Sequence, residues 1–306
     1  MRNLPSVLNC SKQYAGLSEI IVIDDASTEG GLDEIKSAFR NIRFLDHKVN
    51  KGFSEAINTG VKVASGDLIF LLNSDVSPEC NAMNKLATFF SEEDIFSVSP
   101  LILDEDNHPN TYSWNLRAFS WGKFSRQKWD LMTAKKLAET HHLPTLYSSG
   151  GSMMARKTMF QSLQGFDEIF YPFYFEDQDL GARAWKKGWR SLFCPDAIVE
   201  HQRKGSIQSE VPAWKVKLIQ RRNSFIFEWI HLGVLKLLLN RLPQYLKQIF
   251  IRTLRGDWKF LLGFILATTL LPKVTLRRFT KSSDKSYEDI IQQINREVSN
   301  LKAAIK

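Results

Sequence analysis

Two short apolar runs that each end in acidic residues constrain the fold of this chain most strongly. The first run is Glu19–Asp25 (EIIVIDD), and the second is Asp67–Asp75 (DLIFLLNSD). Both have the length and apolar character of strands buried on both faces of a parallel sheet. Apolar residues recur at helical spacing over 53–64, so the segment is predicted to form a strand, a helix and a second strand. In open α/β sheets, ligands bind outside the carboxyl ends of the strands, where Asp24, Asp25 and Asp75 lie.

A second acidic region lies between residues 165 and 201. The sequence predicts a helix over about 177–187 with Gly188 as its stop, and extended segments at 190–194 and 197–199 that bring His201 to the end of a strand. Asp177 would then lie in the first turn of the helix. Acidic residues are common in first turns whatever the function, and a lone histidine is more often structural than a metal ligand. The case for a site therefore depends on the residues acting together.

Asp75 offers a hard carboxylate oxygen at a strand end. Such an oxygen suits Mg²⁺ or Mn²⁺, which can bridge the two phosphates of a nucleoside diphosphate. Asn73 adds a neutral carbonyl oxygen. The simpler interpretation is that these residues, like Asp24 and Asp25, only cap a turn.

Charge divides the chain into two unequal parts. Residues 1–202 carry 21 Lys/Arg against 26 Asp/Glu, whereas residues 203–306 carry 20 against 7. The first part needs a cation to hold a phosphate ligand, and the second is suited to an anionic surface. The three cysteines (Cys10, Cys80 and Cys194) are widely spaced without a metal-binding pattern, which favours reduced thiols and a cytoplasmic location.

After about residue 210 the pattern changes to basic amphipathic helices. Apolar stripes run through residues 225–239 and 254–265, and the longest strongly apolar run, Phe260–Leu271, has 12 residues. A membrane-spanning helix needs about 20, so we expect none. Trp and Leu stripes beside Lys/Arg predict helices that lie on an anionic membrane surface. The alternative is ordinary core-facing helices with solvated basic faces. No recognised nucleic-acid motif accompanies the basic residues, so we expect no nucleic-acid partner.

The order of these motifs resembles the inverting family-2 glycosyltransferases with a GT-A fold, especially their rhamnosyltransferase-like branch. The resemblance runs from about Leu4 to the mid-270s. Its most specific stretch is Gly165–Glu168 through Phe175–Leu180 to Gly188-Trp189 and His201, and further matches are Ile23–Ser27, Asn50–Phe53, Ala64–Asp67 and Leu72–Val76.

The resemblance implies a role for each candidate residue. Asp177 is the catalytic base with Glu176 beside it, Asp75 and His201 hold Mg²⁺ or Mn²⁺, and Asp25 contacts the nucleotide base. The remaining implied nucleotide-sugar contacts are Asp24, Lys51, Gly52, Asn73, Gly150 and Gly151.

Two departures from the family pattern have consequences. Family members usually begin with a strand beside the nucleotide base, and residue 1 here falls within what resembles the following helix, so the resemblance implies a sheet without its first strand. Asn73 stands in place of the first acid of the usual Asp-x-Asp motif. That variant is common in the rhamnosyltransferase-like branch and favours dTDP-rhamnose as the donor, with a UDP-sugar next.

These observations predict a GT-A-type α/β domain over residues 1–210 and a basic, helical, membrane-peripheral region over 211–306. We expect an inverting, metal-dependent transferase on the inner face of the cell membrane, acting on a lipid-linked saccharide or polysaccharide acceptor. Homo-oligomer formation is left open. One alternative is a catalytically inactive partner in a polysaccharide-assembly complex. The other, a nucleotidyltransferase, should show a glycine-rich phosphate loop, which the sequence lacks.

Overall fold

The computed structural model describes residues 3–28, 30–120, 123–202, 211–280 and 285–305. The predicted boundary between the two regions, at residues 210 and 211, borders segment 203–210, which lies outside the described residues. That boundary stays a prediction.

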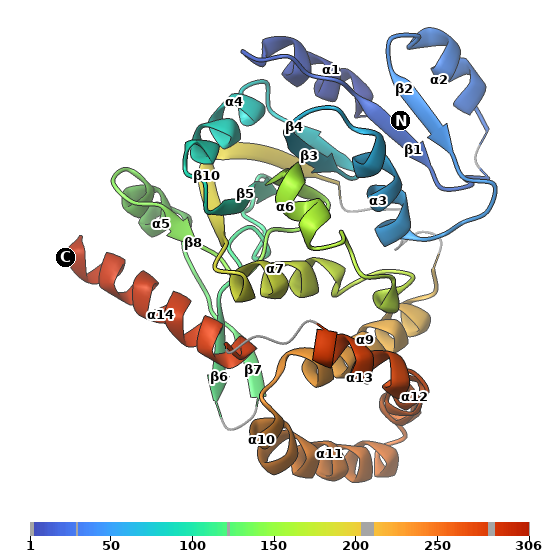
Figure 1. Cartoon of the computed structure of the whole chain (residues 1–306), viewed down its shortest axis with the longest axis vertical. Helices are drawn as coiled ribbons and strands as arrows, with labels where there is room; N and C mark the ends of the chain where they lie inside the picture. Colours follow the sequence, from blue (N-terminus) through green and yellow to red (C-terminus); the bar gives the residue numbers. More distant parts are fainter. Residues whose placement is uncertain (1–2, 29, 121–122, 203–210, 281–284, 306) are drawn as a thin grey trace.

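A mixed six-stranded sheet forms the centre of the molecule (Figure 1). Its strand order is β3-β9-β5-β10-β4, with β8 also paired to β10. β5 and β10 run parallel, and the other pairs are antiparallel. The bounds are β3 (Leu68–Leu72), β4 (Val76–Pro78), β5 (Ile95–Leu103), β8 (Leu143–Pro144), β9 (Ser152–Arg156) and β10 (Arg190–His201). All of β5 except its last residue is buried, as its apolar sequence and central position require.

Two smaller sheets lie apart from the central one. β1 (Ile21–Asp24) pairs in parallel with β2 (Arg43–Asp46), and β6 (Arg117–Ser120) forms an antiparallel hairpin with β7 (Lys123–Arg126). Among the described strands, β1 has no partner other than β2.

Helices cover the sheets and continue beyond them. Those of the α/β part are α1 (Leu4–Gln13), α2 (Leu32–Ala38), α3 (Phe53–Val63), α4 (Ala82–Ala87), α5 (Leu131–Ala138), α6 (Lys157–Ser162) and α7 (Glu176–Lys186), with short 3₁₀ turns η1 (Thr88–Ser91) and η2 (Glu168–Phe170). Those that follow are α9 (Ala213–His231), α10 (Val234–Lys236), the π-helical turn η3 (Leu237–Arg241), α11 (Leu242–Leu254), α12 (Trp258–Thr268), α13 (Leu271–Thr280) and α14 (Tyr287–Ala304).

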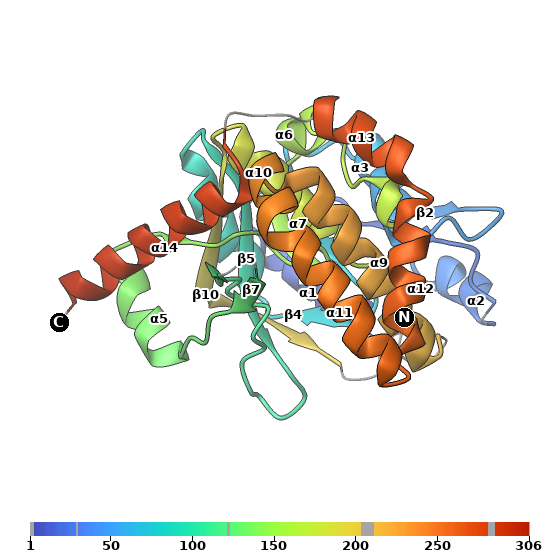
Figure 2. The ribbon, with the colours of Figure 1, turned by 90° about the horizontal axis from the view of Figure 1, so that it is seen from below.

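The C-terminal helices share one core with the sheet. The largest apolar cluster joins Leu101 and Phe193 of the sheet to Phe225 of α9 and Ile290 of α14. Figure 2 shows α9, α11 and α12 packed side by side, with α14 extending away from them. No described helix is by itself long and apolar enough to span a membrane. α12 and α13 meet the criterion of length and composition only when they are taken together, and the chain bends by 62° between them.

The structure confirms the predicted strand, helix and strand as β1, α3 and β3, and the predicted second helix as α7. The parallel pairing expected of both strands holds for β1 but is wrong for β3, which pairs antiparallel with β9. α7 ends at Lys186, and Gly188, with φ of +80°, stops the helix as predicted. The two predicted extended segments are one strand, β10, whose register shifts between Cys194 and Ile198.

The apolar stripe predicted over residues 225–239 does not form one continuous buried face. α9 ends at His231 and Gly233 precedes α10, so Phe225 is buried while Leu235 is 73% and Leu239 is 70% exposed. The second stripe, 254–265, is likewise interrupted, because α11 ends at Leu254 and α12 begins at Trp258.

Candidate active site

A cavity of about 1570 Å³ lies at the carboxyl ends of β1 and β3 and continues between the two strands. Its polar end is lined by Asp24, Asp25, Gly52, Asn73 and Asp75. The sequence predicts all five as nucleotide-sugar or metal contacts, and the structure brings them to one place. Their roles stay predictions.

Asp25 holds the loop that leads into α3. Its carboxylate accepts hydrogen bonds from the backbone N–H groups of Lys51 and Gly52 at 2.9 and 2.7 Å, and His47 Nδ1 lies 2.6 Å from its Oδ1. Asp24 Oδ1 accepts a hydrogen bond from Ser27 N at 3.0 Å in the same way. Both acids therefore fix backbone turns at the rim of the cavity.

Lys51 and Gly52 contribute differently to this loop. The Lys51 side chain points toward Glu55, with Nζ 3.9 Å from Oε1, and does not line the cavity. Gly52 has φ of +84°, and a Cβ there would lie 2.8 Å from the ring of Tyr171. Only glycine suits that conformation and that contact.

A short chain of contacts links the metal candidates to the predicted base. Asn73 N donates to Gly151 O at 2.9 Å, and a Cβ on Gly151 would lie 2.5 Å from Asn73 Nδ2. A Cβ on Gly150 would lie 3.5 Å from Cβ of Asp177. Asn73, Gly151, Gly150 and Asp177 are thus neighbours in space, although 77 positions separate Gly150 from Asn73.

Asp75 and His201 face each other because β4 pairs with β10. Val76 lies opposite His201 in the ladder, and His201 Nε2 is 3.5 Å from Asp75 Oδ2. Asp75 Oδ1 is buried and has no hydrogen-bond partner among the described residues. A buried carboxylate oxygen without a donor, beside an imidazole nitrogen, fits a divalent cation. Imidazole as a ligand suits Mn²⁺ better than Mg²⁺, which prefers oxygen.

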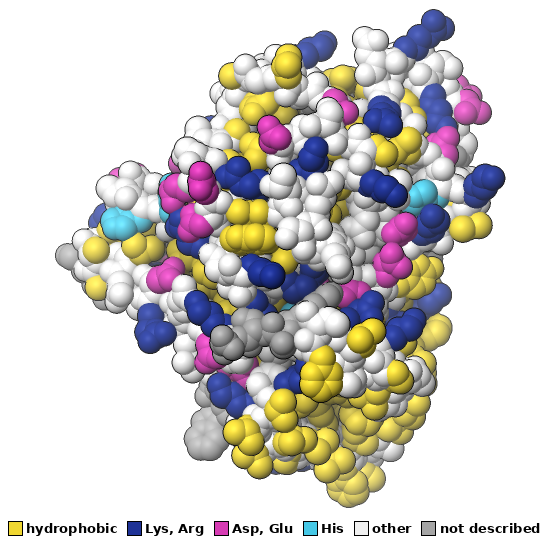
Figure 3. Space-filling view, in the orientation of Figure 1, with side chains coloured by type: hydrophobic (Ala, Val, Ile, Leu, Met, Phe, Trp, Pro, Cys, Tyr) yellow, Lys and Arg dark blue, Asp and Glu magenta, His cyan; other side chains and the backbone are white. Residues whose placement is uncertain are grey.

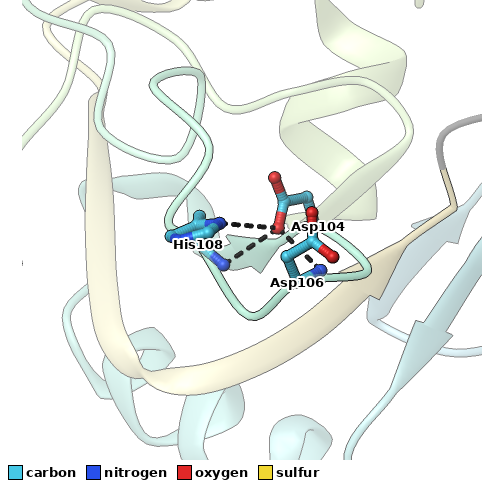
Figure 4. A group of neighbouring side chains, drawn as sticks. All are labelled: Asp104, Asp106 and His108. Atoms are coloured by element: carbon cyan, nitrogen blue, oxygen red, sulfur yellow. Dashed lines mark hydrogen bonds and ion pairs between the residues drawn. The ribbon is translucent and has the colours of Figure 1, made fainter.

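A different group satisfies a simple distance criterion for metal ligands. Asp104, Asp106 and His108 lie together on a loop after β5 (Figure 4). Asp104 Oδ1 accepts hydrogen bonds from the backbone N–H groups of Asp106 and His108 at 3.0 and 2.9 Å, so it shapes the turn. Asp106 and His108 are exposed and none of the three lines the cavity, so we assign them no metal.

The turn before α7 is held in an unusual backbone conformation. Tyr174 and Phe175 have φ of +71° and +79°, values that side chains other than glycine seldom adopt. Asn223 of α9 is fully buried, and its Nδ2 lies 2.7, 3.0 and 2.9 Å from the carbonyl oxygens of Phe170, Phe173 and Tyr174. A single amide from α9 therefore holds the loop that positions the start of α7.

The two acids at the start of α7 have perturbed pKa values. Withdrawal from water raises the pKa of Asp177 to about 6, while hydrogen bonds from the backbone of Gln178 and Gly150 and the charge of Arg117 oppose that rise. Burial and the neighbouring Asp177 charge raise the pKa of Glu176 well above its usual range. At neutral pH, Asp177 is thus mostly ionised. A carboxylate with a pKa near 6 is suited to act as a general base.

Three residues that the sequence did not indicate surround Asp177. Arg117 donates to Gln178 Oε1 at 2.8 Å and interacts with Asp177, Tyr147 and Tyr287. Burial raises the pKa of both phenols, that of Tyr287 to about 12, so both stay protonated. Arg117 begins β6 and Tyr287 begins α14. Neither segment carries a recognisable sequence motif, so the sequence alone did not indicate that these residues lie near Asp177.

A buried ionic group anchors the next turn of α7. Arg183 Nε donates to Asp179 Oδ2 at 2.7 Å, and His231 Nε2 of α9 lies 2.8 Å from Asp179 Oδ1. Burial lowers the pKa of His231 to about 4, so the ring is neutral and donates through Nε2. Arg183 also donates to the carbonyl oxygen of Gly165 at 2.9 Å. Asp179, the third acid of the 175–180 motif, is therefore structural.

The fold and the site together define an α/β protein whose candidate acids meet at the carboxyl ends of the strands. The glycosyl transferase family 2 profile matches residues 3–163, and the chain belongs to that family. N-acetylglucosaminyl-diphospho-decaprenol L-rhamnosyltransferase of Mycobacterium tuberculosis is 25% identical over 204 residues, which cover 60% of this chain and 66% of that protein. The chain thus matches slightly less than two thirds of the length of that relative.

Solved structures with the same fold support the GT-A architecture. GalNAc-T7, solved with UDP, GalNAc and Mn²⁺, superposes with a TM-score of 0.55 and 20% identity over 71% of this chain and 43% of its own. A mannosyltransferase from Pyrobaculum calidifontis, solved with GDP-Man and Mn²⁺, gives a TM-score of 0.52 and 12% identity over 89% of this chain and 70% of its own. The GT-A fold expected from the motifs is confirmed.

Proposed function

We propose that this glycosyltransferase is inverting and metal-dependent, and that it moves a sugar from a nucleoside-diphosphate sugar to a lipid-linked saccharide or polysaccharide. One observation carries the proposal. The Asp75–His201 pair and the ionised Asp177 lie at opposite ends of a short row of contacts through Asn73, Gly151 and Gly150. A metal-held diphosphate at one end and an acceptor hydroxyl at the other would place the anomeric carbon between them.

In this mechanism Asp177 takes the proton of the acceptor hydroxyl. The acceptor oxygen bonds to the anomeric carbon as the bond from that carbon to the diphosphate breaks, and the configuration inverts because attack and departure occur on opposite faces. Asp75 and His201 would hold Mn²⁺, which neutralises charge on the departing diphosphate when bound. Burial and the neighbouring Asp177 charge raise the pKa of Glu176 well above its usual range, so we assign the proton-accepting role to Asp177.

We propose dTDP-rhamnose as the donor and a UDP-sugar as the next candidate. The proposal is supported by Asn73 in place of the first acid of the metal motif and by the name of the mycobacterial relative, an L-rhamnosyltransferase. The solved neighbours contain UDP with GalNAc, or GDP-Man, so a shared fold accommodates several donors.

We propose that the acceptor is met at the inner face of the cell membrane. Helices α10–α13 expose many large apolar side chains, and Figure 3 shows apolar atoms gathered at the lower end of the molecule, where these helices lie. The most exposed include Leu235, Leu239, Leu246, Phe250, Leu254 and Phe279. Exposed cations of the same region include Lys247 of α11, Arg255 just after α11, and Lys273 of α13. An apolar surface with adjacent cations is suited to an anionic lipid surface.

The direct test is release of nucleoside diphosphate from a panel of sugar nucleotides with a membrane lipid extract as acceptor. We expect release from one donor with Mn²⁺, less release with Mg²⁺, and none with EDTA. Release that is unchanged by EDTA would contradict the metal assignment. Absence of release from every donor, with nucleotide binding retained, would favour the inactive partner of an assembly complex.

A further inference from the structure

One face of α9 forms part of the wall of the cavity. Lys215, Leu218, Ile219 and Arg222 line the cavity, and their spacing of three and four residues places them on one side of the helix. Leu218 and Ile219 are buried, whereas Lys215 is exposed and Arg222 is half-buried. These four residues, here called the α9 wall, therefore combine two cations with apolar surface between them.

The charge of Arg222 is not balanced by an acid of the protein. Its neighbour Arg221 pairs with Asp257 at 2.7 Å, but no carboxylate among the described residues lies within ion-pair distance of Arg222. Arg222 Nε donates to Asn223 Oδ1 at 2.9 Å and its Nη2 donates to Tyr171 O, while Nη1 has no acceptor in the described part of the chain. Withdrawal from water lowers the pKa of Arg222, although a guanidinium stays charged. A cation in this state is suited to bind an anion.

A short row of contacts joins Arg222 to the polar end of the cavity. Arg222 donates to Tyr171 O, and the ring of Tyr171 lies against Gly52, where an added Cβ would be 2.8 Å from it. Gly52 N in turn donates to Asp25 Oδ2 at 2.7 Å. The next residue of α9, Asn223, holds the turn that leads into α7. Arg222 therefore lies close both to the acids of the site and to the turn before the candidate base.

The α9 wall continues onto the apolar surface of α12, which packs along α9 (Figure 2). The two helices touch at Gly263, because a Cβ there would lie 3.1 Å from Cβ of Arg221. Leu266, about one turn further along α12, lines the cavity and is 36% exposed. The cavity thus reaches from the acids at the strand ends to the exposed apolar side chains of α12.

The chemistry of the α9 wall matches a phosphate joined to a hydrocarbon chain. Arginine binds phosphate oxygens through charge-assisted hydrogen bonds, and lysine adds a second positive charge. Leu218, Ile219 and Leu266 offer apolar surface that suits a hydrocarbon chain rather than a second charged group. The diphosphate of the donor has its own candidate cation site at Asp75 and His201. A phosphate at the α9 wall is therefore better assigned to the other substrate.

We propose that the α9 wall binds the phosphate of a lipid-linked acceptor, with Arg222 and Lys215 on the phosphate and the apolar side chains of the wall and Leu266 along the start of the lipid chain. The inference rests on the proposed transferase function, and it narrows the acceptor to a saccharide carried on a lipid phosphate. The lipid chain enters from the exposed apolar side of α12, and the saccharide faces Asp177.

Calorimetry with geranyl phosphate as the probe, in EDTA and without donor, tests this binding directly. EDTA removes the metal, so the probe cannot bind through a cation at Asp75. The double change Lys215→Gln with Arg222→Gln should weaken binding by about tenfold or more, because charge-assisted hydrogen bonds to the phosphate are lost. Arg222→Lys, which keeps the charge, should weaken it less. Lys217→Gln is the matched control, since it removes the same charge from an exposed residue of α9 that does not line the cavity, and it should change nothing.

Lys215→Gln alone provides a check that does not disturb the turn held by Arg222. Lys215 is exposed and makes no hydrogen bond or ion pair with another described residue, so this variant should fold like the unchanged protein and still bind geranyl phosphate several times more weakly.

Two further probes identify the class of ligand. Inorganic phosphate, which has no chain, and dihexanoyl phosphatidic acid, which has two chains as a membrane phospholipid does, should both bind more weakly than geranyl phosphate. Leu266→Asn should weaken the binding of geranyl phosphate and leave that of inorganic phosphate unchanged. Ile265→Asn, the exposed neighbour on α12 that does not line the cavity, should affect neither.

The proposal is overturned if the unchanged protein does not bind geranyl phosphate, or if the double variant binds it equally well. Equal binding of inorganic phosphate would reduce the wall to a bare anion site, and equal binding of phosphatidic acid would assign it to a membrane phospholipid. Loss of Mn²⁺-dependent UDP binding in the double variant, with geranyl phosphate still bound, would assign the two cations to the donor. Because no readout needs sugar transfer, failure of this inference and failure of the proposed transferase activity are separate results.

Discussion

At the scale of single residues, two adjacent carboxyls have pKa values raised by burial but shaped by different neighbours. Both Glu176 and Asp177 are withdrawn from water, but Asp177 receives hydrogen bonds from the backbone of Gln178 and Gly150 and the favourable charge of Arg117, whereas Glu176 lies beside the charge of Asp177. Hydrogen bonds and an opposite charge favour the ionised form, so the rise in the pKa of Asp177 is limited to about 6, and Asp177 is mostly ionised at neutral pH. The acid–base assignment follows from these contacts rather than from residue type.

Replacing Arg117 by Gln tests this assignment through pH dependence. An ionised Asp177 is needed for catalysis, so activity should fall as the pH drops through about 6. Loss of the Arg117 charge raises the pKa of Asp177, so the acid limb of the pH–rate profile should move to higher pH, with activity recovered in alkaline buffer. Arg117→Lys, which keeps the charge, should move it less. A uniform loss of activity at every pH would contradict the proposed effect of Arg117.

Asp75→Asn tests the metal site. The change removes the anionic oxygen that lies beside His201 and has no hydrogen-bond partner among the described residues. Mn²⁺ affinity, measured by calorimetry or electron paramagnetic resonance, should fall by about tenfold or more. Asp104→Asn is the matched control from the exposed loop, and it should bind Mn²⁺ like the unchanged protein. The opposite pattern would move the metal site to that loop.

At the scale of secondary-structure elements, α9 organises the start of α7. Asn223 contacts the carbonyl groups of the strained turn, and His231 of the same helix contacts Asp179. The family profile ends at residue 163, so neither α7 nor α9 falls within it. The helix that follows the sheet is thus part of the support of the candidate base.

Asn223→Ala should destabilise the protein by about 2–3 kcal/mol, because buried carbonyl groups lose their donor. Urea unfolding measures this change, and the rate of transfer should fall with it because Asp177 is held less firmly. Asn240→Ala, an exposed asparagine of the same region, should change stability by less than about 0.5 kcal/mol. Equal effects of the two substitutions would refute the role given to Asn223.

Local patterns predicted the elements well and the contacts between distant segments poorly. β1, α3, β3 and α7 follow from apolar periodicity and stop signals that lie within the elements themselves. The pairing of Asp75 with His201 required a resemblance, because 126 positions separate them. Asn223 and Arg117 carried no signal, since a buried polar residue looks like an exposed one in sequence. The sequence patterns did not predict that the apolar stripes break near Gly233 and Gly256, because the helical periodicity was extended through both glycines.

At the scale of the whole molecule, the acids at the strand ends lie apart from the exposed apolar side chains of α10–α13, although Lys215 and Arg222 of α9 also line the cavity. The cavity lies at the strand ends, whereas the apolar side chains of α10–α13 gather at the lower end of the molecule (Figures 1 and 3). Residues 1–202 carry a net charge of about −5, and residues 203–306 carry about +13. This separation would let the protein rest on lipid with one region and bind its donor with the other.

The proposed membrane contact is tested by vesicle co-sedimentation. The protein should bind vesicles with anionic lipid more tightly than neutral ones, and salt should weaken the difference. Leu246→Glu with Phe250→Glu should reduce binding by about tenfold or more, since both side chains are largely exposed apolar surface. Leu17→Glu changes a fully exposed leucine outside α10–α13 and should have no effect. An equal loss of vesicle binding in the double variant and in Leu17→Glu would contradict a specific membrane-binding face on α10–α13.

The most direct test of the central claim is Asp177→Asn, measured for sugar transfer and for Mn²⁺-dependent nucleotide binding in the same preparation. The account predicts that transfer falls by about 10²-fold or more, because the group that accepts the proton is lost. Nucleotide affinity should stay close to that of the unchanged protein, since Asp75 and His201 remain in place. Unchanged transfer, or loss of nucleotide binding in a folded variant, would contradict the assignment of Asp177 as the base.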